Sequence, residues 1–401
     1  MKSDFFSGNR KKLGNELKGG LVILTAFNKM QRTPDDAYSF EQEGNFWYLT
    51  GIEESDWWLI YDGTRSRSWL VRPDVDQTLV TFNGQLSDKQ ATTISGINEI
   101  ISYDDALSLI RQLKRSHNLV HTIKQPENIK RYGFVPNPAH SKMADLLDRY
   151  FESVQDCRKE LAVLRAIKQP EEIAQIKKAI NITKNAFERV QKNLSNYKYE
   201  YEIEADITHE FLRRGAEHGY SPIVASGKSS CTLHYSKNSS KLQNGKPILV
   251  DVGARLGGYS ADITRTYSFG KPSKRLVEVH EAVCEAQASI IKALRPTLSL
   301  QDLQHIVEKE MSEKLKELNL IKDDPLTELP YYFPHAIGHG LGVDLHESLA
   351  HETLQEGMVI TIEPGIYIPK ESIGVRIEDD ILITKKGALN LSAKLPTNLV
   401  Y

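Results

Sequence analysis

The chain has 401 residues, more than one ordinary hydrophobic core supports, so two domains are expected. Its apolar content of 40% and charged content of 26% are those of a soluble globular protein, and the formal net charge of −2 gives no reason to expect a nucleic-acid or membrane partner. The apolar runs are far shorter than the ~20 residues of a spanning helix. Three widely spaced cysteines and a polar N-terminus favour a cytoplasmic location.

The first part of the chain, residues 1–156, is expected to form a mixed α/β domain. Short β-rich runs recur there with turn residues between them, at 21–27, 46–49, 57–61, 68–71 and 78–82. All four tryptophans lie in this part, and we interpret them as aromatics that pack on strands in a core. The alternative, that one of them reaches a subunit interface or a substrate rim, stays open.

The pattern changes near residue 156, where we place the boundary of a second domain, 157–401. Pro170 stands at the favoured first position of a helix, and apolar residues spaced by three and four from Ile173 to Leu194 predict one long helix packed on a sheet. Two further helices are predicted at 274–294 and at 300–318, the latter capped by Ser299. Strands are expected at 358–368 and 374–384.

Two aspartates stand out in the segment VDVGARLGGYSADITRT, residues 250–266. Asp251 and Asp262 lie in stretches that otherwise have the pattern of buried strands. A carboxylate inside an apolar strand costs several kcal/mol unless a positive charge meets it. Because both aspartates need a compensating positive charge, a bound metal cation is the simplest explanation for the pair.

Three histidines follow in the segment FPHAIGHGLGVDLHE, residues 333–347. His335, His339 and His346 alternate with glycines that let the backbone approach a ligand closely. The segment is not a dinucleotide fingerprint, and it is not the zincin pattern H-E-x-x-H, because the position that requires the second histidine is Ala350.

Two glutamates complete a candidate ligand set. Glu363 is expected at the end of an apolar strand, and Glu378 two residues after Arg376 on the same strand face. Four carboxylates balance two divalent cations, and an oxygen-rich set with one imidazole suits Mn²⁺ or Co²⁺ better than a structural zinc site. Two neighbouring ions can share and activate a water, so hydrolysis of an amide is the natural chemistry.

Taken in order, these segments resemble the metallopeptidases of the pita-bread fold, and among them the Xaa-Pro aminopeptidases. The resemblance rests on LHY (233–235), VDVGA and GYSADITRT, HAIGHGLGVDLHE, TIEPGIY and GVRIEDD, with FEQEGNFWYLTGIEE (40–54) in the first domain. It implies a catalytic pita-bread domain with a curved antiparallel sheet covered by helices. A smaller creatinase-type α/β domain precedes it and is expected to serve oligomerisation and to form a wall of the substrate cleft.

The resemblance also implies a role for each site residue. Asp251 would bind one metal ion, Asp262 and Glu378 would bridge both, and His339 and Glu363 would complete the other site. Catalytic roles fall to His346, Glu363 and His234, with Glu363 moving a proton and His346 binding the scissile carbonyl or its oxyanion. The residues implied to bind substrate are His234, His335, His346 and Arg376, and Thr264 would support the ligands. Tyr367 is either a second such partner or a core tyrosine.

The implied activity is release of the first residue from peptides with proline in second place, by a hydroxide shared between two divalent ions, Mn²⁺ first and Co²⁺ or Zn²⁺ as alternatives. An Xaa-Pro bond lacks the N–H that many peptidases bind. A prolidase that cleaves Xaa-Pro dipeptides and a non-catalytic peptide-binding module remain alternatives. Homodimers or homotetramers are the implied assemblies.

Overall fold

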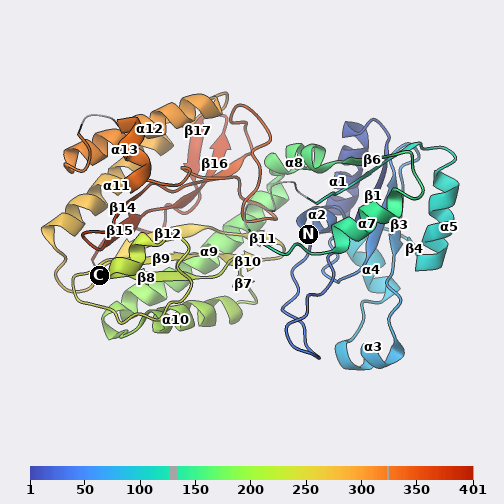
Figure 1. The fold of residues 1–401 in the computed structure, drawn as a ribbon, viewed down its shortest axis with the longest axis horizontal. Coiled ribbons are helices and arrows are strands. Elements are labelled where there is room, and N and C mark those ends of the chain that lie inside the picture. The colour runs from blue at the N-terminus through green and yellow to red at the C-terminus, as the bar shows by residue number, and fades with distance from the viewer. Residues whose placement is uncertain (126–132, 323–324, 401) are drawn as a thin grey trace. The chain divides into compact units, whose positions relative to one another are not determined.

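The computed structural model describes residues 1–125, 133–322 and 325–400. It divides into two compact units, Met1–Leu164 and Arg165–Tyr401 (Figure 1). This division falls within helix α8 (Arg158–Ala166), whereas the sequence-based boundary at 156 lies just before that helix. Within the described ranges, no helix is both long and apolar enough to cross a lipid bilayer.

Unit 1 is built on a mixed sheet with the order β4-β3-β2-β1-β5-β6. Neighbouring strands are antiparallel in β1–β2 and β2–β3 and parallel in the other pairs. The strands are β1 (Leu21–Thr25), β2 (Trp58–Asp62), β3 (Arg67–Val71), β4 (Glu99–Ile101), β5 (Leu119–Thr122) and β6 (Ser153–Asp156). The helices are α1 (Ser3–Glu16), α2 (Gly44–Thr50), α3 (Gln77–Asn83), α4 (Asp88–Ser95), α5 (Tyr103–Leu113) and α7 (Ala139–Leu147).

Two of the β-rich runs expected in this unit are helices, so these predictions were wrong. The run 46–49 lies in α2, and the run 78–82 lies in α3. Each helix is capped by an acidic side chain: Glu43 accepts from the Phe46 amide at 2.6 Å and Asp76 from the Thr78 amide at 2.7 Å. These caps satisfy amides that would otherwise lack partners, and they outweigh the β-propensity of short apolar runs.

The long helices predicted for the second part of the chain are confirmed. Helix α9 (Pro170–Asn193) starts at its proline, α11 spans Lys274–Ala293, and α12 (Leu300–Glu317) is capped by Ser299, which accepts from the Asp302 amide. The stripe along α9 is buried as expected, including Ile176, Ile180 and Phe187. The other helices are α10 (Glu200–Leu212), α13 (Pro325–Tyr332) and the short 3₁₀ helices η1 (Leu194–Asn196) and η2 (Gly227–Cys231).

The strands of unit 2 form small antiparallel sheets between two pairs of helices (Figure 1). Helices α9 and α10 lie against one group of strands. Helix α11 lies against the other group, and α12 packs on α11. The first group is β7 (Glu217–His218), β8 (Ile223–Ser226), β9 (Ile248–Val252), β10 (Ala254–Leu256), β11 (Tyr259–Ser260) and β12 (Ile263–Tyr267). The second is β13 (Val359–Ile362), β14 (Gly365–Ile368), β15 (Ile373–Arg376), β16 (Asp379–Thr384) and β17 (Gly387–Asn390).

The two strands expected near the C-terminus are each interrupted at a glutamate. The predicted strand 358–368 divides into β13 and β14 at Glu363 and Pro364, and 374–384 divides into β15 and β16 at Ile377 and Glu378. Pro364 has no amide for the ladder, and the Glu378 amide instead donates to the Thr264 carbonyl at 3.1 Å. The interruptions therefore turn both glutamates toward β12 and its neighbours.

Candidate metal centre

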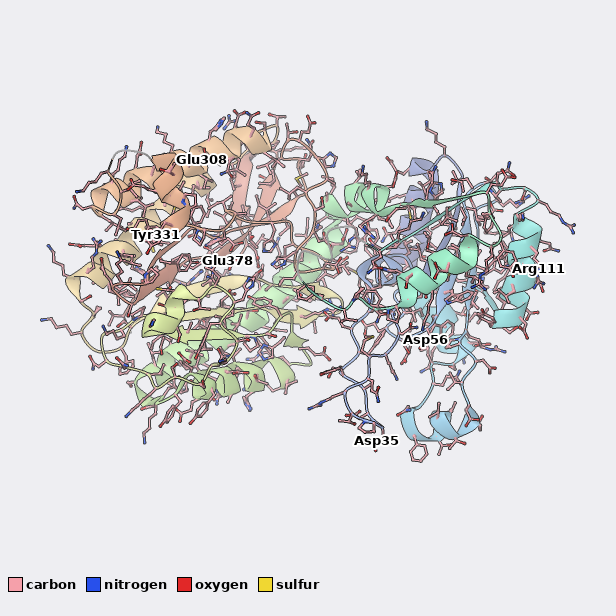
Figure 2. All side chains as sticks on the ribbon, viewed as in Figure 1. Asp35, Asp56, Arg111, Glu308, Tyr331 and Glu378 are labelled. Atoms are coloured by element: carbon pink, nitrogen blue, oxygen red, sulfur yellow. The ribbon has the colours of Figure 1, made fainter. Side chains whose placement is uncertain are left out.

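A cavity of about 390 Å³ in unit 2 collects every residue that the sequence indicated as a site residue. Its lining includes Asp251, Asp262, His339, Glu363, Glu378, His234, His335, His346 and Arg376. Glu378 lies in the interior of the unit, as Figure 2 shows. A larger cavity of about 730 Å³ lies in unit 1. Among the residues that the structure describes, however, the groupings of acidic, histidine and cysteine side chains with metal-ligand spacing all lie in unit 2. The chemistry of the lining, rather than the volume, identifies the site.

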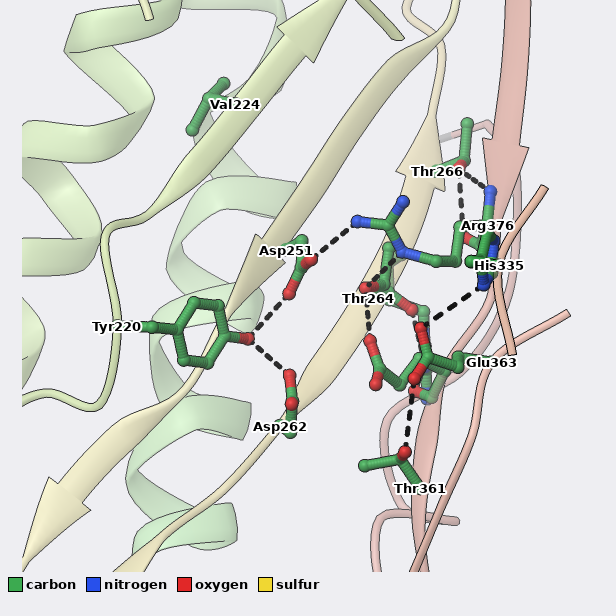
Figure 3. A network of polar contacts seen from close by, with 12 residues as sticks. Tyr220, Val224, Asp251, Asp262, Thr264, Thr266, His335, Thr361, Glu363 and Arg376 are labelled. Carbon is green, nitrogen blue, oxygen red and sulfur yellow. Dashed lines mark hydrogen bonds and ion pairs between the residues drawn. The ribbon is translucent and has the colours of Figure 1, made fainter. Parts of the chain in front are cut away.

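The two aspartates are brought together by the pairing of β9 with β12. Asp251 lies on β9 opposite Thr264, and Asp262 directly precedes β12. Tyr220 lies beside both, with its hydroxyl oxygen 2.6 Å from Oδ1 of each aspartate (Figure 3). The Tyr220 hydroxyl is thus shared by two buried carboxylates. This shared contact keeps the two Oδ1 atoms close to one another.

Glu378 and Asp251 are held from the other side by a second set of donors. The Thr264 hydroxyl donates to Glu378 Oε2 at 2.6 Å and accepts from Arg376 Nε at 3.2 Å. The guanidinium also donates to Asp251 Oδ2 at 2.5 Å and to the Tyr367 hydroxyl at 2.9 Å. These contacts connect β9, β12, β14 and β15 in one network, of which Figure 3 shows the contacts of Arg376 with Asp251 and Thr264.

Glu363 and His339 meet at the end of β13. His339 Nε2 is 3.6 Å from Glu363 Oε1 and 3.4 Å from Asp262 Oδ2. The Thr361 hydroxyl accepts from the His339 amide at 3.0 Å and donates to Glu363 Oε1 at 3.3 Å. A single threonine on the strand therefore sets the spacing between the imidazole and the carboxylate.

The buried carboxylates of this cluster need a positive charge to compensate them. Burial and the neighbouring carboxylates raise the pKa of Glu378 well above its ordinary value and the pKa of Glu363 to about 7. The pKa of Asp251 is also raised, by burial and by Asp262, although Arg376 opposes the shift. Burying so many carboxylates together is costly unless further positive charge compensates them, and the arrangement therefore fits divalent metal ions.

The donor atoms also have the spacing that metal ligands need. Three groups each bring their ligand atoms within 4.8 Å of one another: Asp251, Asp262 and Glu378; His339, Glu363 and Glu378; and Asp262, His339 and His346. The first two groups contain the five residues expected as ligands and share Glu378. The third group places His346 close enough to be a ligand as well. Measuring the metal content of His346→Ala distinguishes a ligand from a substrate-binding residue.

The remaining histidines border the cavity. The His339 and His346 rings meet edge to face, with centroids 4.2 Å apart. His346 is exposed as a whole, but partial desolvation of its ring, followed by the His339 charge, lowers its pKa. His234, in the turn after η2, is exposed.

His335 is held as a neutral ring. Its Nε2 is 2.9 Å from the Tyr367 hydroxyl, its Nδ1 is 2.8 Å from the Ala336 carbonyl, and burial followed by the Arg376 charge lowers its pKa to about 4. Because Arg376 donates to the Tyr367 oxygen, the hydroxyl proton points to Nε2, and Nδ1 carries the ring proton.

Sequence reasoning missed Tyr220 entirely. It lies in the connection between β7 and β8, in a segment without metal-ligand spacing or strand periodicity, so no local pattern indicates that it reaches Asp251 and Asp262. Tyr220 is 31 positions from Asp251 and 42 from Asp262 in the sequence, so its contact with them becomes visible only in the folded structure.

The fold and this ligand set define a metal-dependent hydrolase, and comparison with known families gives the class directly. Residues 174–385 match the model of metallopeptidase family M24, and residues 6–121 match that of the aminopeptidase P N-terminal domain. The chain belongs to metallopeptidase family M24 and has the two-domain aminopeptidase P fold.

Similar proteins within the family act on Xaa-Pro bonds, as their names state. The chain is 33% identical to the Xaa-Pro aminopeptidase of Haemophilus influenzae, over 94% of this chain and 91% of that protein. It is 31% identical to the Xaa-Pro dipeptidase of Pyrococcus furiosus, over 87% of this chain and 90% of that protein. Among solved structures, a putative aminopeptidase P from Bacillus anthracis superposes with a TM-score of 0.90 at 31% identity, covering 100% of this chain and 97% of the other.

Proposed function

We propose that this protein is an Xaa-Pro aminopeptidase, a metallo-exopeptidase that releases the first residue from peptides with proline in second place. The observation that carries the proposal is the convergence of four carboxylates and His339 in one cavity of a family M24 domain. The length-wide similarity to an Xaa-Pro aminopeptidase supports the choice of substrate. The catalytic chemistry is assigned to residues 157–401, and residues 1–156 are assigned to assembly of a homodimer or homotetramer.

The metal centre is proposed to hold two divalent ions, with Mn²⁺ as the first choice and Co²⁺ or Zn²⁺ as alternatives. Asp251 would hold one ion, His339 and Glu363 the other, and Asp262 and Glu378 both, in agreement with the two ligand groups that share Glu378. Bound there, two divalent ions supply Lewis acidity and a water nucleophile at neutral pH. The oxygen-rich donor set favours Mn²⁺.

The side chains around the ligands have separate tasks in this proposal. Glu363, whose pKa burial raises to about 7, is suited to take a proton and return it to the leaving amine. His346 at the cavity edge would donate to the scissile carbonyl oxygen as negative charge develops on it. Arg376 orients Asp251 through its 2.5 Å contact and favours the ionised form of that carboxylate.

The substrate is recognised without the amide proton that proline lacks. The carboxylate-rich end of the cavity suits a free α-amine, which fixes the substrate's first residue. His234, His335 and His346 border the same cavity, with Leu233 and Leu345 beside them. These imidazole and aliphatic faces offer an apolar slot for the pyrrolidine ring.

The experiment compares Xaa-Pro-Xaa tripeptides with Xaa-Pro dipeptides in the presence of Mn²⁺. An Xaa-Pro aminopeptidase cleaves the tripeptide, whereas a prolidase cleaves only the dipeptide, and a peptide-binding module cleaves neither. The prolidase is the second candidate because a dipeptidase relative aligns over most of the chain. Cleavage restricted to dipeptides would replace the first proposal with the second.

A further inference from the structure

The segment that joins His339 to His346 forms a closed loop. The Gly340 amide donates to the Glu347 carbonyl at 3.1 Å, and the Glu347 amide donates to the Gly340 carbonyl at 2.8 Å. This reciprocal pair brings the two ends of the loop together, one residue beyond each histidine. The backbone of the loop therefore carries both rings.

The carboxylate of Glu347 fills the inside of this loop. Its Oε1 accepts from the Val343 amide at 2.9 Å and the Asp344 amide at 3.3 Å. A Cβ added at Gly342 would lie 2.5 Å from the same oxygen, so only glycine leaves room for the carboxylate. The glycine pattern of this segment thus serves an internal carboxylate as well as any ligand.

Two buried cations hold the carboxylate from behind. Arg165 donates through Nη2 to Oε1 at 2.6 Å, and Lys168 donates through Nζ to Oε2 at 2.8 Å. The side chains are 7%, 1% and 4% exposed for Arg165, Lys168 and Glu347, so solvent screens these contacts little. Burial alone would raise the pKa of Glu347, but attraction to Arg165 and then Lys168 lowers it to about 2.

The ring of His346 depends on this loop for its position. It is exposed, it has no hydrogen-bond partner among the described residues, and its ring contact is with His339. A side chain held so weakly can be placed only by its own backbone. The neighbouring Glu347, anchored by two backbone hydrogen bonds and two cations, is what fixes that backbone.

We propose that Glu347, clamped by Arg165 and Lys168, is a positioning residue that holds His346 over the metal centre. The inference rests on the proposed function, because it explains how His346, a residue of the proposed active site, is held in position. Both carboxylate oxygens face donors, so the NH₂ of an amide would meet a donor wherever it turned. Glu347→Gln therefore keeps the shape of the side chain and breaks the clamp.

The test is a double-mutant cycle with tripeptide substrate and metal-loaded enzyme. Glu347→Gln alone is expected to lower kcat about 10- to 100-fold, with metal content unchanged and KM altered less than about twofold. In a His346→Ala background the same substitution should lower kcat less than about twofold, because the residue it acts through is gone. An equal loss in both backgrounds, or unchanged kcat in the single variant, would overturn the proposal.

A matched control comes from the same cluster. Asp344 belongs to the loop, and its carboxylate binds the Arg165 guanidinium. Because that carboxylate is 50% exposed and its ion pair is screened by solvent, Asp344→Asn should leave kcat within about twofold. If Glu347→Gln does not fold, Arg165→Lys replaces it in the cycle, because it keeps the charge and removes the forked donation. Arg165→Lys must then lower kcat in the wild-type background and have less than about a twofold effect in the His346→Ala background.

A crystal structure separates this inference from the proposed function. In Glu347→Gln the His346 ring is expected to leave its place 4.2 Å from the His339 ring, while the ligands stay in position. An unmoved ring overturns the positioning role, whatever the substrate proves to be. If the wild-type protein cleaves neither peptide, the proposed function fails, and the position of the ring alone decides this inference.

Discussion

At the scale of single residues, each carboxylate of the centre is fixed by a neutral or cationic donor before any metal ion is considered. Tyr220 serves Asp251 and Asp262, Thr264 serves Glu378, and Thr361 serves Glu363. Such partners orient ligand oxygens and reduce the entropy lost on binding an ion. The ligands themselves remain the residues whose removal matters most.

We expect Glu378→Ala to abolish turnover and metal loading together, because Glu378 belongs to both ligand groups. Asp262→Ala should behave in the same way. Metal content by atomic emission and cleavage of a tripeptide are the measurements. Glu371→Ala is the control, since that carboxylate pairs with Arg275 at the surface. Full activity of Glu378→Ala with its metal retained would contradict the ligand assignment.

His346→Ala should keep both metal content and fold and lower kcat about 100-fold, as expected when one donor to a developing oxyanion is lost. Steady-state kinetics and metal analysis on the same preparation check this. Loss of metal would instead make His346 a ligand, as its grouping with Asp262 and His339 allows.

At the scale of elements, the site is formed where strands are interrupted and where a loop is closed. Both glutamates follow the end of a short strand, and the closed loop between His339 and His346 returns to β13 through the Leu341 amide, which donates to Val359. Chain breaks of this kind re-aim side chains that a continuous strand would place on one face or the other.

The clamp on this loop predicts a pH dependence of stability. The folded pKa of Glu347 is depressed from 4.5 to about 2, so its contribution is present above pH 4.5 and is lost as the pH falls toward 2. The full contribution is on the order of 3 kcal/mol. Urea unfolding of metal-free wild type and Glu347→Gln at pH 7, 4 and 3 should give a stability difference that shrinks with falling pH. A constant difference would refute this assignment.

At the scale of the whole molecule, the two units have separate cores. One core is built on the sheet of unit 1 and includes Leu21, Ile60 and Val120, while another, in unit 2, includes Val283, Ile360 and Val375. The metal centre belongs to unit 2, and all four tryptophans belong to unit 1. Tryptophan fluorescence therefore reports on unit 1 alone, whereas far-UV circular dichroism reports on the helices and strands of both units.

Addition of Mn²⁺ to metal-free protein should raise the thermal midpoint of unit 2 and leave that of unit 1 in place. At about 100-fold excess over Kd, the part of the far-UV circular dichroism transition that tryptophan fluorescence does not follow is expected to shift upward by about 5–10 °C. Tryptophan fluorescence should melt at the same temperature with and without the ion, and Mg²⁺ serves as the control ion. Equal shifts in both signals would mean that the two units unfold as one.

Much of this protein is determined by local sequence. The long helices follow from apolar spacing and their caps, as in α9 and α12, and the proposed ligand residues follow from the chemical cost of carboxylates in apolar strands. Residue type and spacing are local properties, so Asp251, Asp262, Glu363 and Glu378 could be selected before any fold was known.

Only the tertiary structure decided the rest. The helical state of 46–49 and 78–82 depends on acidic caps that outweigh β-propensity, and the break at Glu378 depends on its amide donating to Thr264 of β12. Tyr220 and the clamp on Glu347 are contacts across long stretches of chain, 182 residues in the case of Arg165 and Glu347. Such contacts exist only after the chain has folded, because nothing in the spacing of the residues records which distant partners will meet.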